Sequence, residues 1–327
     1  MLLVLAIDLG VLNRKAHVVT IKEALRFTGV VVFLATCFAG VIYAAYENHW
    51  LGLGLQVDKL DGMVNDGRLA AVKFFTGYVI ELSLSADNVF VIAMIFQYLR
   101  VPPQYQHRVL FWGILGALLM RGTMILLGAS LIARYHWILY LFGAFLVYTA
   151  VKMLLAKDDH EGEAPGEGFV LRQVRRAFPI TPTYHGQHFA IQQEGKWVLT
   201  PLAVALVLVE TTDLIFAVDS IPAIFAITTD PFLVFTSNVF AILGLRSLYF
   251  ALAGAIEKFR YLKVSLAAIL GLVGVKMLVA DLLKEYLGPN FNFWLLGMVA
   301  LILAAGVVAS WWRAGRDGEA RKEMPED

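Results

Sequence analysis

Apolar segments of about 20 residues or more recur along most of this 327-residue chain. At 1.5 Å per residue, each is long enough to cross the ~30 Å hydrocarbon layer of a bilayer as a helix. Only 16% of the residues are charged, against about 25% in soluble domains. Because the alternating pattern of barrel strands is missing, we predict an all-α polytopic membrane protein.

The apolar pattern predicts nine transmembrane segments. The first is too short to span alone, and Arg14 and Lys15 follow it rather than precede it, which argues against a secretory signal. We interpret it as a half-span, or as the end of a span that starts upstream. The nine segments are 1–12, 24–46, 69–98, 107–134, 136–156, 199–227, 234–256, 262–286 and 291–312.

The loop charges predict the orientation, because cytoplasmic loops collect Lys and Arg. Of the 27 Lys and Arg residues, four fall inside spans, five on one side and eighteen on the other. The N-terminus is therefore predicted outside and the C-terminus in the cytoplasm. A net charge of +1 gives no reason to expect a nucleic-acid partner.

The chain also repeats itself at an offset of 124 to 132 residues. Glu81-x5-Asp87 aligns with Asp213-x5-Asp219, and VKML at 151–154 aligns with VKML at 275–278. The two copies also align Arg121 with Arg246. Because an odd number of crossings separates the copies, we predict an inverted repeat of three plus three helices, a common plan in secondary transporters.

This repeat divides the chain into five regions. The long loop contains HFAIQQ and WVLT, which predict two short strands around a turn. The next span is predicted to open with Thr200 as N-cap and Pro201 as first helical residue, a signal that recurs at Asp230 and Pro231. The regions are 1–68 with the short segment and first full span, 69–156 with the first repeat, 157–198 with the cytoplasmic loop, 199–286 with the second repeat, and 287–327 with the last span and tail.

Ionisable side chains lie deep inside the predicted spans. A charge at the bilayer centre costs roughly 2.5 to 3.5 kcal/mol, so such groups normally pair or line a watery path. The acids outnumber the arginines, which leaves surplus negative charge near the midplane. The acids are Glu81, Asp87, Glu210, Asp213 and Asp219, and the arginines are Arg121 and Arg246.

The spacing of these acids predicts a local break. Six residues turn a helix through about 600°, so acids six apart do not share a face of a straight helix. Pro222 predicts a break beside Asp219 because proline donates no backbone hydrogen bond. In the first copy, Ser83, Ser85 and Asn88 offer hydroxyl and amide groups. Carboxylate, amide and carbonyl oxygens suit Mn²⁺, Mg²⁺ or Ca²⁺, and we predict a site for such a cation.

Each of these groups also has a structural interpretation. The acids fit ion pairs with the two arginines or a proton relay, and Glu210 fits a ligand and a proton carrier equally. We expect Arg121 and Arg246 to act as structural counter-charge, and Lys276 is deep enough to neutralise one acid. Three acids of the outer loop are expected to be solvated, although they would also attract cations: Asp58, Asp61 and Asp66.

Several long motifs resemble the TerC family of integral membrane proteins, including its Alx branch. They are ELSLSADNVFV (81–91), FPITPTYHG (178–186), VETTDLIFAVDSIPAIFAIT (209–228) and TSNVFAILGLRSLYF (236–250), and the likeness covers nearly the whole chain. The family is associated with tellurium resistance, is linked to Mn²⁺ export across the bacterial inner membrane, and is related to LysE-type exporters. The resemblance implies manganese as the cation, outward as the direction, and metal ligands at Glu81, Asp87, Asn88, Glu210, Asp213 and Asp219.

The sequence thus favours a secondary transporter in which a divalent cation and protons compete for the same carboxylates. It has no GxxxxGK[ST] phosphate loop, and we expect neither an enzyme nor a resident cofactor. The expected partners are the transported cation and the lipid bilayer. An intramembrane aspartyl protease would need Gly-x-Gly-Asp, which is missing around these aspartates. A channel remains open, as does a membrane partner that helps other proteins insert or acquire metal.

Overall fold

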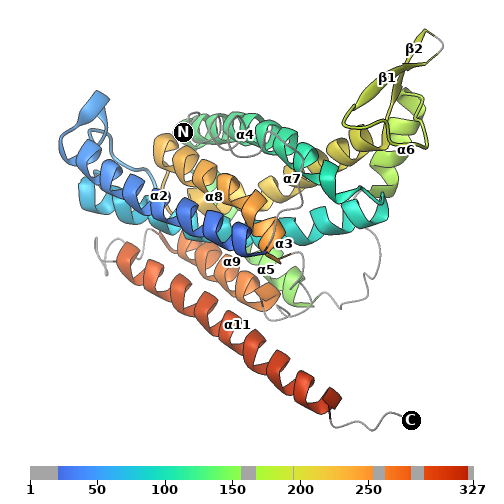
Figure 1. Ribbon diagram of the computed structural model, residues 1–327. Coiled ribbons are helices and arrows are strands. Elements are labelled where there is room, and N and C mark those ends of the chain that lie inside the picture. The colour runs from blue at the N-terminus through green and yellow to red at the C-terminus, as the bar shows by residue number, and fades with distance from the viewer. Residues whose placement is uncertain (1–20, 156–166, 194, 253–261, 281–290, 323–327) are drawn as a thin grey trace.

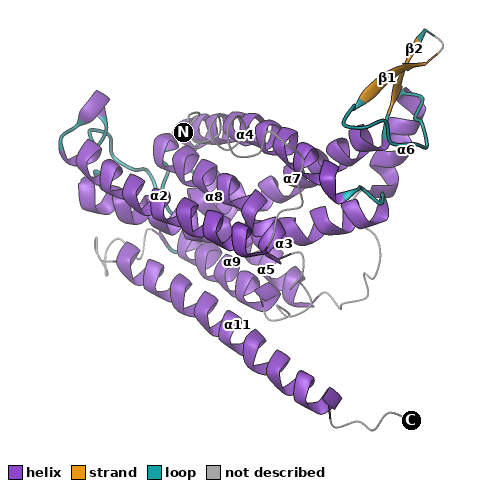
Figure 2. Cartoon of the chain, viewed as in Figure 1, coloured by secondary structure: helices purple, strands orange, loops and turns teal. Residues whose placement is uncertain are grey.

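The computed structural model describes residues 21–155, 167–193, 195–252, 262–280 and 291–322. Within these ranges the chain forms a bundle of helices, and one short β-hairpin lies at one end of the bundle (Figures 1 and 2). The prediction of an all-helical membrane region is confirmed for this part of the chain, and the hairpin lies in the long loop, where two strands were predicted.

Every predicted span from the second onward contains a helix. The first, 1–12, lies outside the described residues. A 3-10 helix and a further α-helix lie in the loops. The elements are α2 (Ile21–Glu47), η2 (Trp50–Gly52), α3 (Gly67–Tyr98), α4 (Pro103–Arg134), α5 (Ile138–Leu155), α6 (Glu167–Ala177), β1 (Ala190–Gln193), β2 (Lys196–Leu199), α7 (Pro201–Phe225), α8 (Pro231–Leu252), α9 (Leu262–Leu278) and α11 (Phe291–Lys322).

Six of the described helices are long and apolar enough to cross a membrane: α2, α3, α4, α5, α7 and α11. The apolar parts of α8 and α9 are shorter, Pro231–Leu245 and Val264–Leu278. The chain therefore has several membrane-spanning helices, and the total of nine stays a prediction.

Two helix starts show how local sequence sets the boundaries. α7 begins at Pro201 as predicted, but the Thr200 hydroxyl donates to the carbonyl of His188 at 2.7 Å and does not cap the helix. α8 begins at Pro231, and there Asp230 does act as a cap, because its Oδ1 accepts from the backbone N–H of Phe232 at 3.0 Å.

Loops that the charge pattern places on the same side of the membrane do meet. At one end, the backbone N–H of Lys59 donates to Thr229 Oγ1 at 3.0 Å, and its Nζ donates to the carbonyl of Ala133. At the other end, the Tyr184 hydroxyl of the long loop donates to the carbonyl of Leu99 at 2.8 Å. These contacts place the α2–α3 loop, the end of α4 and the α7–α8 connection at one end of the bundle, and the α3–α4 connection with the long loop at the other.

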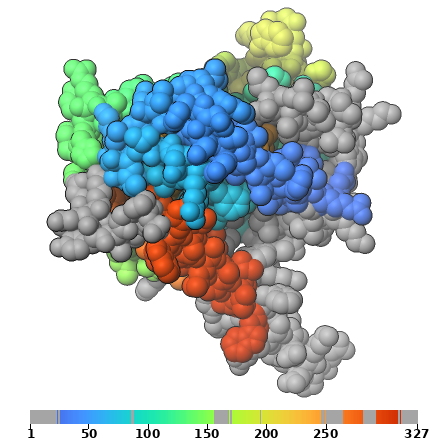
Figure 3. All heavy atoms as spheres, turned by 90° about the vertical axis from the view of Figure 1, so that its left-hand side faces the viewer, coloured from blue at the N-terminus to red at the C-terminus, as the bar shows by residue number. Residues whose placement is uncertain are grey.

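The helices of the two predicted repeats pack against one another. α3 packs on α8, α4 on α7 and α5 on α9. α2 covers α3 and α8, and α11 lies along α9 and α3 at the edge of the bundle (Figures 1 and 3). Arginine in the middle of α4 and acids in α3 and α7 thereby come within reach of each other.

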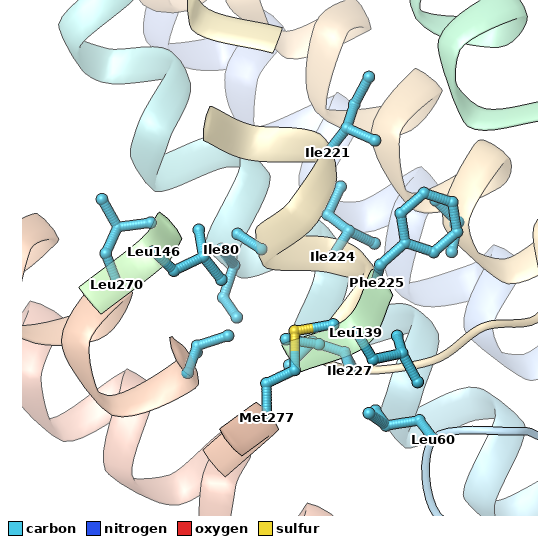
Figure 4. Close-up of a cluster of buried hydrophobic side chains, with 14 of the residues drawn as sticks. Leu60, Ile80, Leu139, Leu146, Ile221, Ile224, Phe225, Ile227, Leu270 and Met277 are labelled. Atoms are coloured by element: carbon cyan, nitrogen blue, oxygen red, sulfur yellow. The ribbon is translucent and has the colours of Figure 1, made fainter. Parts of the chain in front are cut away.

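One cluster of buried apolar side chains fixes α7 against its neighbours (Figure 4). Ile224 and Phe225 of α7 lie in it beside Leu146 of α5 and Met277 of α9. Between helices in lipid, close packing rather than water exclusion provides the attraction. This packing orients the second half of α7, which carries Asp219.

Small residues let α5 and α9 approach closely, which leads to a stability prediction. A Cβ built on Gly274 would lie 2.9 Å from the carbonyl oxygen of Gly143, so backbone would have to move. We expect Gly274→Ala to lower the free energy of unfolding by about 1 to 3 kcal/mol. Thermal unfolding in detergent measures this, and Gly297→Ala, whose Cβ would contact nothing within 4 Å, is the control. Equal stability of the two variants would contradict the close approach.

Candidate functional site

Arg121 in the middle of α4 is buried and links two acids from different helices. Its Nη2 and Nε donate to the two carboxylate oxygens of Asp213 on α7, at 2.9 and 3.1 Å. Its Nη1 donates to Oε1 of Glu81 on α3. The two-oxygen contact with Asp213 is the strong, planar geometry that arginine forms with a carboxylate. Arg121 therefore has the counter-charge position that the sequence predicted.

The two bridged acids occupy corresponding positions of the predicted repeat. Glu81 is the first acid of its motif in α3 and Asp213 the first in α7. Because two carboxylates share one guanidinium, the group keeps one negative charge when all three are ionised. Removing two acids from water for a single cation is costly, so further positive charge would stabilise this cluster.

Unpaired oxygen atoms continue from this cluster along one face of α3. Glu81 Oε2, Ser85 Oγ and Asn88 Oδ1 are buried and have no hydrogen-bond partner among the described residues. They are spaced four and three residues apart, so they point to the same side of the helix. Buried oxygens in folded proteins normally have a hydrogen-bond partner or a ligand, and a water molecule or a cation would supply one to these three.

Asn238 of α8 joins the same cluster, although it was not among the site residues predicted from sequence. Its Oδ1 accepts from Nη1 of Arg121 at 3.3 Å, and its Nδ2 has no partner in the described part of the chain. Ser220 Oγ accepts from the same nitrogen at 3.3 Å. The signal in the sequence was the polar run Thr-Ser-Asn at 236–238 within an otherwise apolar helix.

Glu210 on α7 is half-buried and lies against Gly116 of α4. A Cβ on this glycine would be only 1.9 Å from Glu210 Oε1, so the carboxylate occupies the space that a side chain would fill. Oε2 of Glu210 has no hydrogen-bond partner among the described residues. Glu210 is three residues before Asp213, on the same side of the helix. It is thus a further acid beside the arginine-bridged pair.

Asp219 faces away from this cluster toward α5. Its Oδ1 accepts from the Thr149 hydroxyl at 3.4 Å. The predicted break beside it is wrong: α7 runs uninterrupted through Pro222 to Phe225. A continuous helix turns residues six apart to different sides, so Asp213 and Asp219 contact different helices.

Two predicted site residues have side chains outside the described set. Asp87 lies in α3 and Arg246 in α8, and only their helical backbone is described. Among the described residues, no three His, Cys, Asp or Glu side chains lie close enough to share a metal ion. The described part of the predicted site therefore combines carboxylates with neutral hydroxyl and amide oxygens.

Lys276, the third predicted counter-charge, lies at the end of the bundle that carries the α2–α3 loop. Its Nζ donates to the carbonyl of Ala226 at 2.8 Å and to Asn292 Oδ1 at 3.3 Å. Its electrostatic neighbours include Asp61 and Asp58 of that loop. The structure thus places it with the outer-loop acids rather than beside Arg121.

The expectation that Asp58 is solvated is wrong. Asp58 is 3% exposed, and Nζ of Lys73 donates to its Oδ2 at 2.8 Å. Thr228 and Thr229, from the α7–α8 connection, donate their hydroxyls to the same carboxylate. Lys73 also contacts Asp61 at 2.7 Å. Nothing local in the sequence marked this network, because it joins segments about 170 residues apart.

The network that Asp58 forms with Lys73, Thr228 and Thr229, called the outer network below, predicts how stability depends on pH. Burial alone would raise the pKa of Asp58, but the charge of Lys73 and hydrogen bonds from Lys73, Thr228 and Thr229 hold it well below its usual value. A carboxylate whose pKa is lower in the folded than in the unfolded state stabilises the fold at pH values above its unfolded pKa of about 4. This stabilisation is lost as the pH falls from there toward the folded-state pKa.

We therefore expect Asp58→Asn to lower the free energy of unfolding by about 1 to 3 kcal/mol at neutral pH. The difference from the wild type should shrink progressively below about pH 4. Thermal unfolding of both proteins at neutral and acidic pH measures it. A difference that stays constant across this range would contradict the assignment.

The amino-acid sequence of this chain matches a known family of membrane proteins. The profile described as integral membrane protein TerC family matches residues 67–318. "Uncharacterized membrane protein STKORF319" of Myxococcus xanthus is 50% identical over 307 residues, 94% of this chain and 88% of the relative.

Two further relatives extend the comparison. "Putative membrane-bound redox modulator Alx" of Escherichia coli (strain K12) is 44% identical over 315 residues, 95% of this chain and 91% of the relative. A membrane protein of Rickettsia felis is 38% identical over 306 residues, covering 94% and 93% of the two chains. No solved structure matches this chain. With a profile match over most of its length and relatives aligned almost end to end, this multi-pass membrane protein belongs to the TerC family.

Proposed function

We propose that this protein is a secondary transporter that exports a divalent cation, Mn²⁺, in exchange for protons. The observation that carries the proposal is the buried cluster around Arg121. It holds more negative than positive charge, and next to it lie oxygen atoms without hydrogen-bond partners among the described residues. A cation passing through the membrane would satisfy both the charge and the oxygens.

The charge balance fits the exchange of one divalent cation for two protons. When ionised, Glu81, Asp213 and Arg121 leave one negative charge. Glu210 adds a second, while the charge of Asp219 is offset in part by nearby Lys152. Among the groups whose side chains are described, this leaves a surplus of two negative charges. One divalent cation or two protons neutralise such a surplus, and a buried surplus must be neutralised at each stage of a transport cycle.

The ligand chemistry supports a hard cation. Glu81 Oε2, Ser85 Oγ and Asn88 Oδ1 are all oxygens, the donor type that Mn²⁺, Mg²⁺ and Ca²⁺ prefer. In the described part of the chain, the side-chain partners of Arg121 are carboxylate, hydroxyl and amide oxygens, with no imidazole or thiol among them. Within this group of cations, the choice of Mn²⁺ and of outward transport rests on the resemblance to the family. We also propose a location in the bacterial inner membrane with the N-terminus outside and the C-terminus in the cytoplasm; the bacterial relatives support the location, and the loop charges support the orientation.

Symmetry in the helix contacts supports the inverted repeat. A two-fold relation between the repeats exchanges α3 with α7 and α4 with α8, so the α3–α8 contact corresponds to the α4–α7 contact, and both are present. At an offset of 124, contact of Gly271 with Ala150 corresponds to contact of Val147 with Gly274. A Cβ on Gly271 would lie 3.6 Å from Ala150 and one on Gly274 3.0 Å from Val147.

One observation also fits the alternative role of a membrane partner that helps other proteins insert or acquire metal. The Arg121 bridge is a good structural ion pair, and its acids need no transported ion to hold the helices together.

The name of the Escherichia coli relative points to redox control. Cys37 is the single cysteine here, so this chain cannot cycle between a dithiol and an intramolecular disulfide. We therefore propose that any redox effect follows from the metal ion it moves.

Transport by the purified protein tests the proposal. Liposomes that contain the protein are loaded with Mn²⁺, and release is followed with a manganese-sensitive dye outside. We expect release to exceed that from protein-free liposomes, to saturate with Mn²⁺, and to accelerate when protons are more concentrated outside. Release equal to that from protein-free liposomes would favour the partner role. Release that neither saturates nor responds to a proton gradient would indicate a channel.

A glycine substitution tests whether the position of Glu210 matters. In Gly116→Ala the new methyl group would overlap the carboxylate, and the flexible Glu210 side chain would move away. Since small displacements of reacting groups have large kinetic effects, we expect the Mn²⁺ transport rate to fall about tenfold or more. Gly297→Ala, on α11 with open space around its Cβ, should transport like the wild type. Wild-type transport by Gly116→Ala would remove Glu210 from the transport site.

A further inference from the structure

A polar cavity lies at the end of the bundle that carries α6 and the hairpin. It has a volume of about 660 Å³ and lies between the end of α3, helix α6, residues 178–182 and the start of α7. Arg100 and Arg175 line it, together with the aromatic rings of Tyr98 and Phe178. None of the buried acids of the proposed transport site contributes to it. It is therefore a separate feature of the molecule.

The two arginines bring concentrated positive charge to this cavity. Both are exposed, and within the described residues neither forms an ion pair. Arg100 directly follows the last turn of α3 with a φ of 53°, the left-handed conformation that favours glycine at this position. This backbone conformation ends α3 at the cavity and leaves Arg100 among its lining residues.

We also expect the cavity to lie at the depth of lipid headgroups, because it is at the end of a helix long and apolar enough to span the membrane. Tyr98 is the last residue of membrane-spanning α3, and both Tyr98 and Phe178 are more than half exposed. Exposed aromatic rings at the end of a spanning helix are typical of the membrane–water interface. α6 carries basic residues in its last turn and packs on α7 at this end of the bundle (Figure 1). The loop charges predict that this side is cytoplasmic, where anionic lipids concentrate.

We propose that this cavity binds the phosphate group of an anionic phospholipid, with Arg100 and Arg175 as its ligands. Guanidinium groups match phosphate oxygens in charge and in the geometry of two parallel hydrogen bonds. The exposed rings of Tyr98 and Phe178 would contact the apolar part of the same lipid. Inorganic phosphate shares the recognised chemistry, but the depth of the cavity and its aromatic rim favour a lipid. The proposal does not depend on which ion the protein transports.

Native mass spectrometry of the intact protein in detergent tests this site with phosphatidylglycerol and phosphatidylethanolamine. The test variant is R100Q/R175Q. The control variant is R172Q/R176Q, which removes the same charge from exposed arginines of α6 that do not line the cavity. R100K/R175K keeps the charge but not the guanidinium geometry. Unchanged thermal unfolding of each variant shows that the fold is retained.

We expect the wild type to bind phosphatidylglycerol about 25-fold more tightly than phosphatidylethanolamine, because each of the two arginines near an anionic lipid contributes about fivefold. R100Q/R175Q should lose this preference, R100K/R175K should keep part of it, and R172Q/R176Q should keep most of it. Equal losses in the two glutamine variants would show only general surface attraction and would overturn the proposal. Displacement of bound phosphatidylglycerol by millimolar inorganic phosphate would overturn the lipid assignment in favour of a soluble phosphate.

Discussion

Arg121→Ala is expected to destabilise the protein by about 3 to 5 kcal/mol, because it leaves two buried carboxylates without their cation. Arg121 is 2% exposed, and the three helices α3, α4 and α7 meet at its guanidinium. Glu81 is fully buried and Asp213 nearly so, so water cannot replace the lost contacts. Thermal unfolding in detergent measures the loss, provided that enough of the variant inserts to be purified.

Two further variants keep this prediction testable when Arg121→Ala fails to accumulate. Arg134→Ala removes an exposed arginine from the last turn of the same helix and should change stability by less than about 0.5 kcal/mol. The triple variant R121M/E81Q/D213N removes the cation together with both charges and should recover most of the stability, since no charge then lies unpaired. A triple variant as unstable as Arg121→Ala would contradict the electrostatic explanation.

Asp219→Asn is expected to abolish Mn²⁺ transport while leaving stability nearly unchanged. The carboxylate has one long hydrogen bond, at 3.4 Å from Thr149, and is not bridged by Arg121 as Asp213 is. Little structure therefore depends on its charge. Asp219 faces away from the Arg121 cluster but lies less than two helical turns beyond Asp213 on α7, and we propose that it holds the cation at a second stage of its passage. Losing even an outer-shell partner of a metal ligand costs about 10- to 100-fold, so loss of this ligand should lower Mn²⁺ transport at least 100-fold.

Two variants of neighbouring residues should differ from Asp219→Asn in transport or in stability. Asp213→Asn should lose both transport and stability, because Asp213 also holds Arg121. Thr149→Val removes the contact with Asp219 but keeps the carboxylate, and should lower transport less than about threefold. Liposome transport and thermal unfolding are measured on the same preparations. Normal transport by Asp219→Asn would exclude this acid as a ligand for the transported cation.

The proposed site was only partly predictable from the sequence. Acids and arginines inside apolar segments stand out because the bilayer makes each of them costly, and this identified Glu81, Asp213 and Arg121. The sequence did not show that one arginine would bridge both acids, since that depends on α4 packing on α7 beside α3. Nor did it show that α7 would continue through Pro222, because neighbouring helices support a proline within a membrane helix.

The burial of Asp58 and its partners in the outer network could not be predicted from the sequence. Asp58 and Lys73 have no local pattern that marks them as partners, and the α7–α8 connection that completes their network follows about 155 residues after Lys73. A carboxylate in a polar loop is usually solvated. Burial here results from the way in which that loop closes over the ends of α3 and α7.

By itself, the sequence determined the membrane class, the positions of the described helices, the hairpin in the long loop and which loops share a side. These depend on hydropathy, prolines and caps within short stretches of chain, because a bilayer requires each spanning segment to satisfy its own backbone. Only the tertiary structure decided which charges became partners. The Arg121 bridge forms where α7 packs on α4 beside α3, and side-chain packing between these helices selects that meeting point.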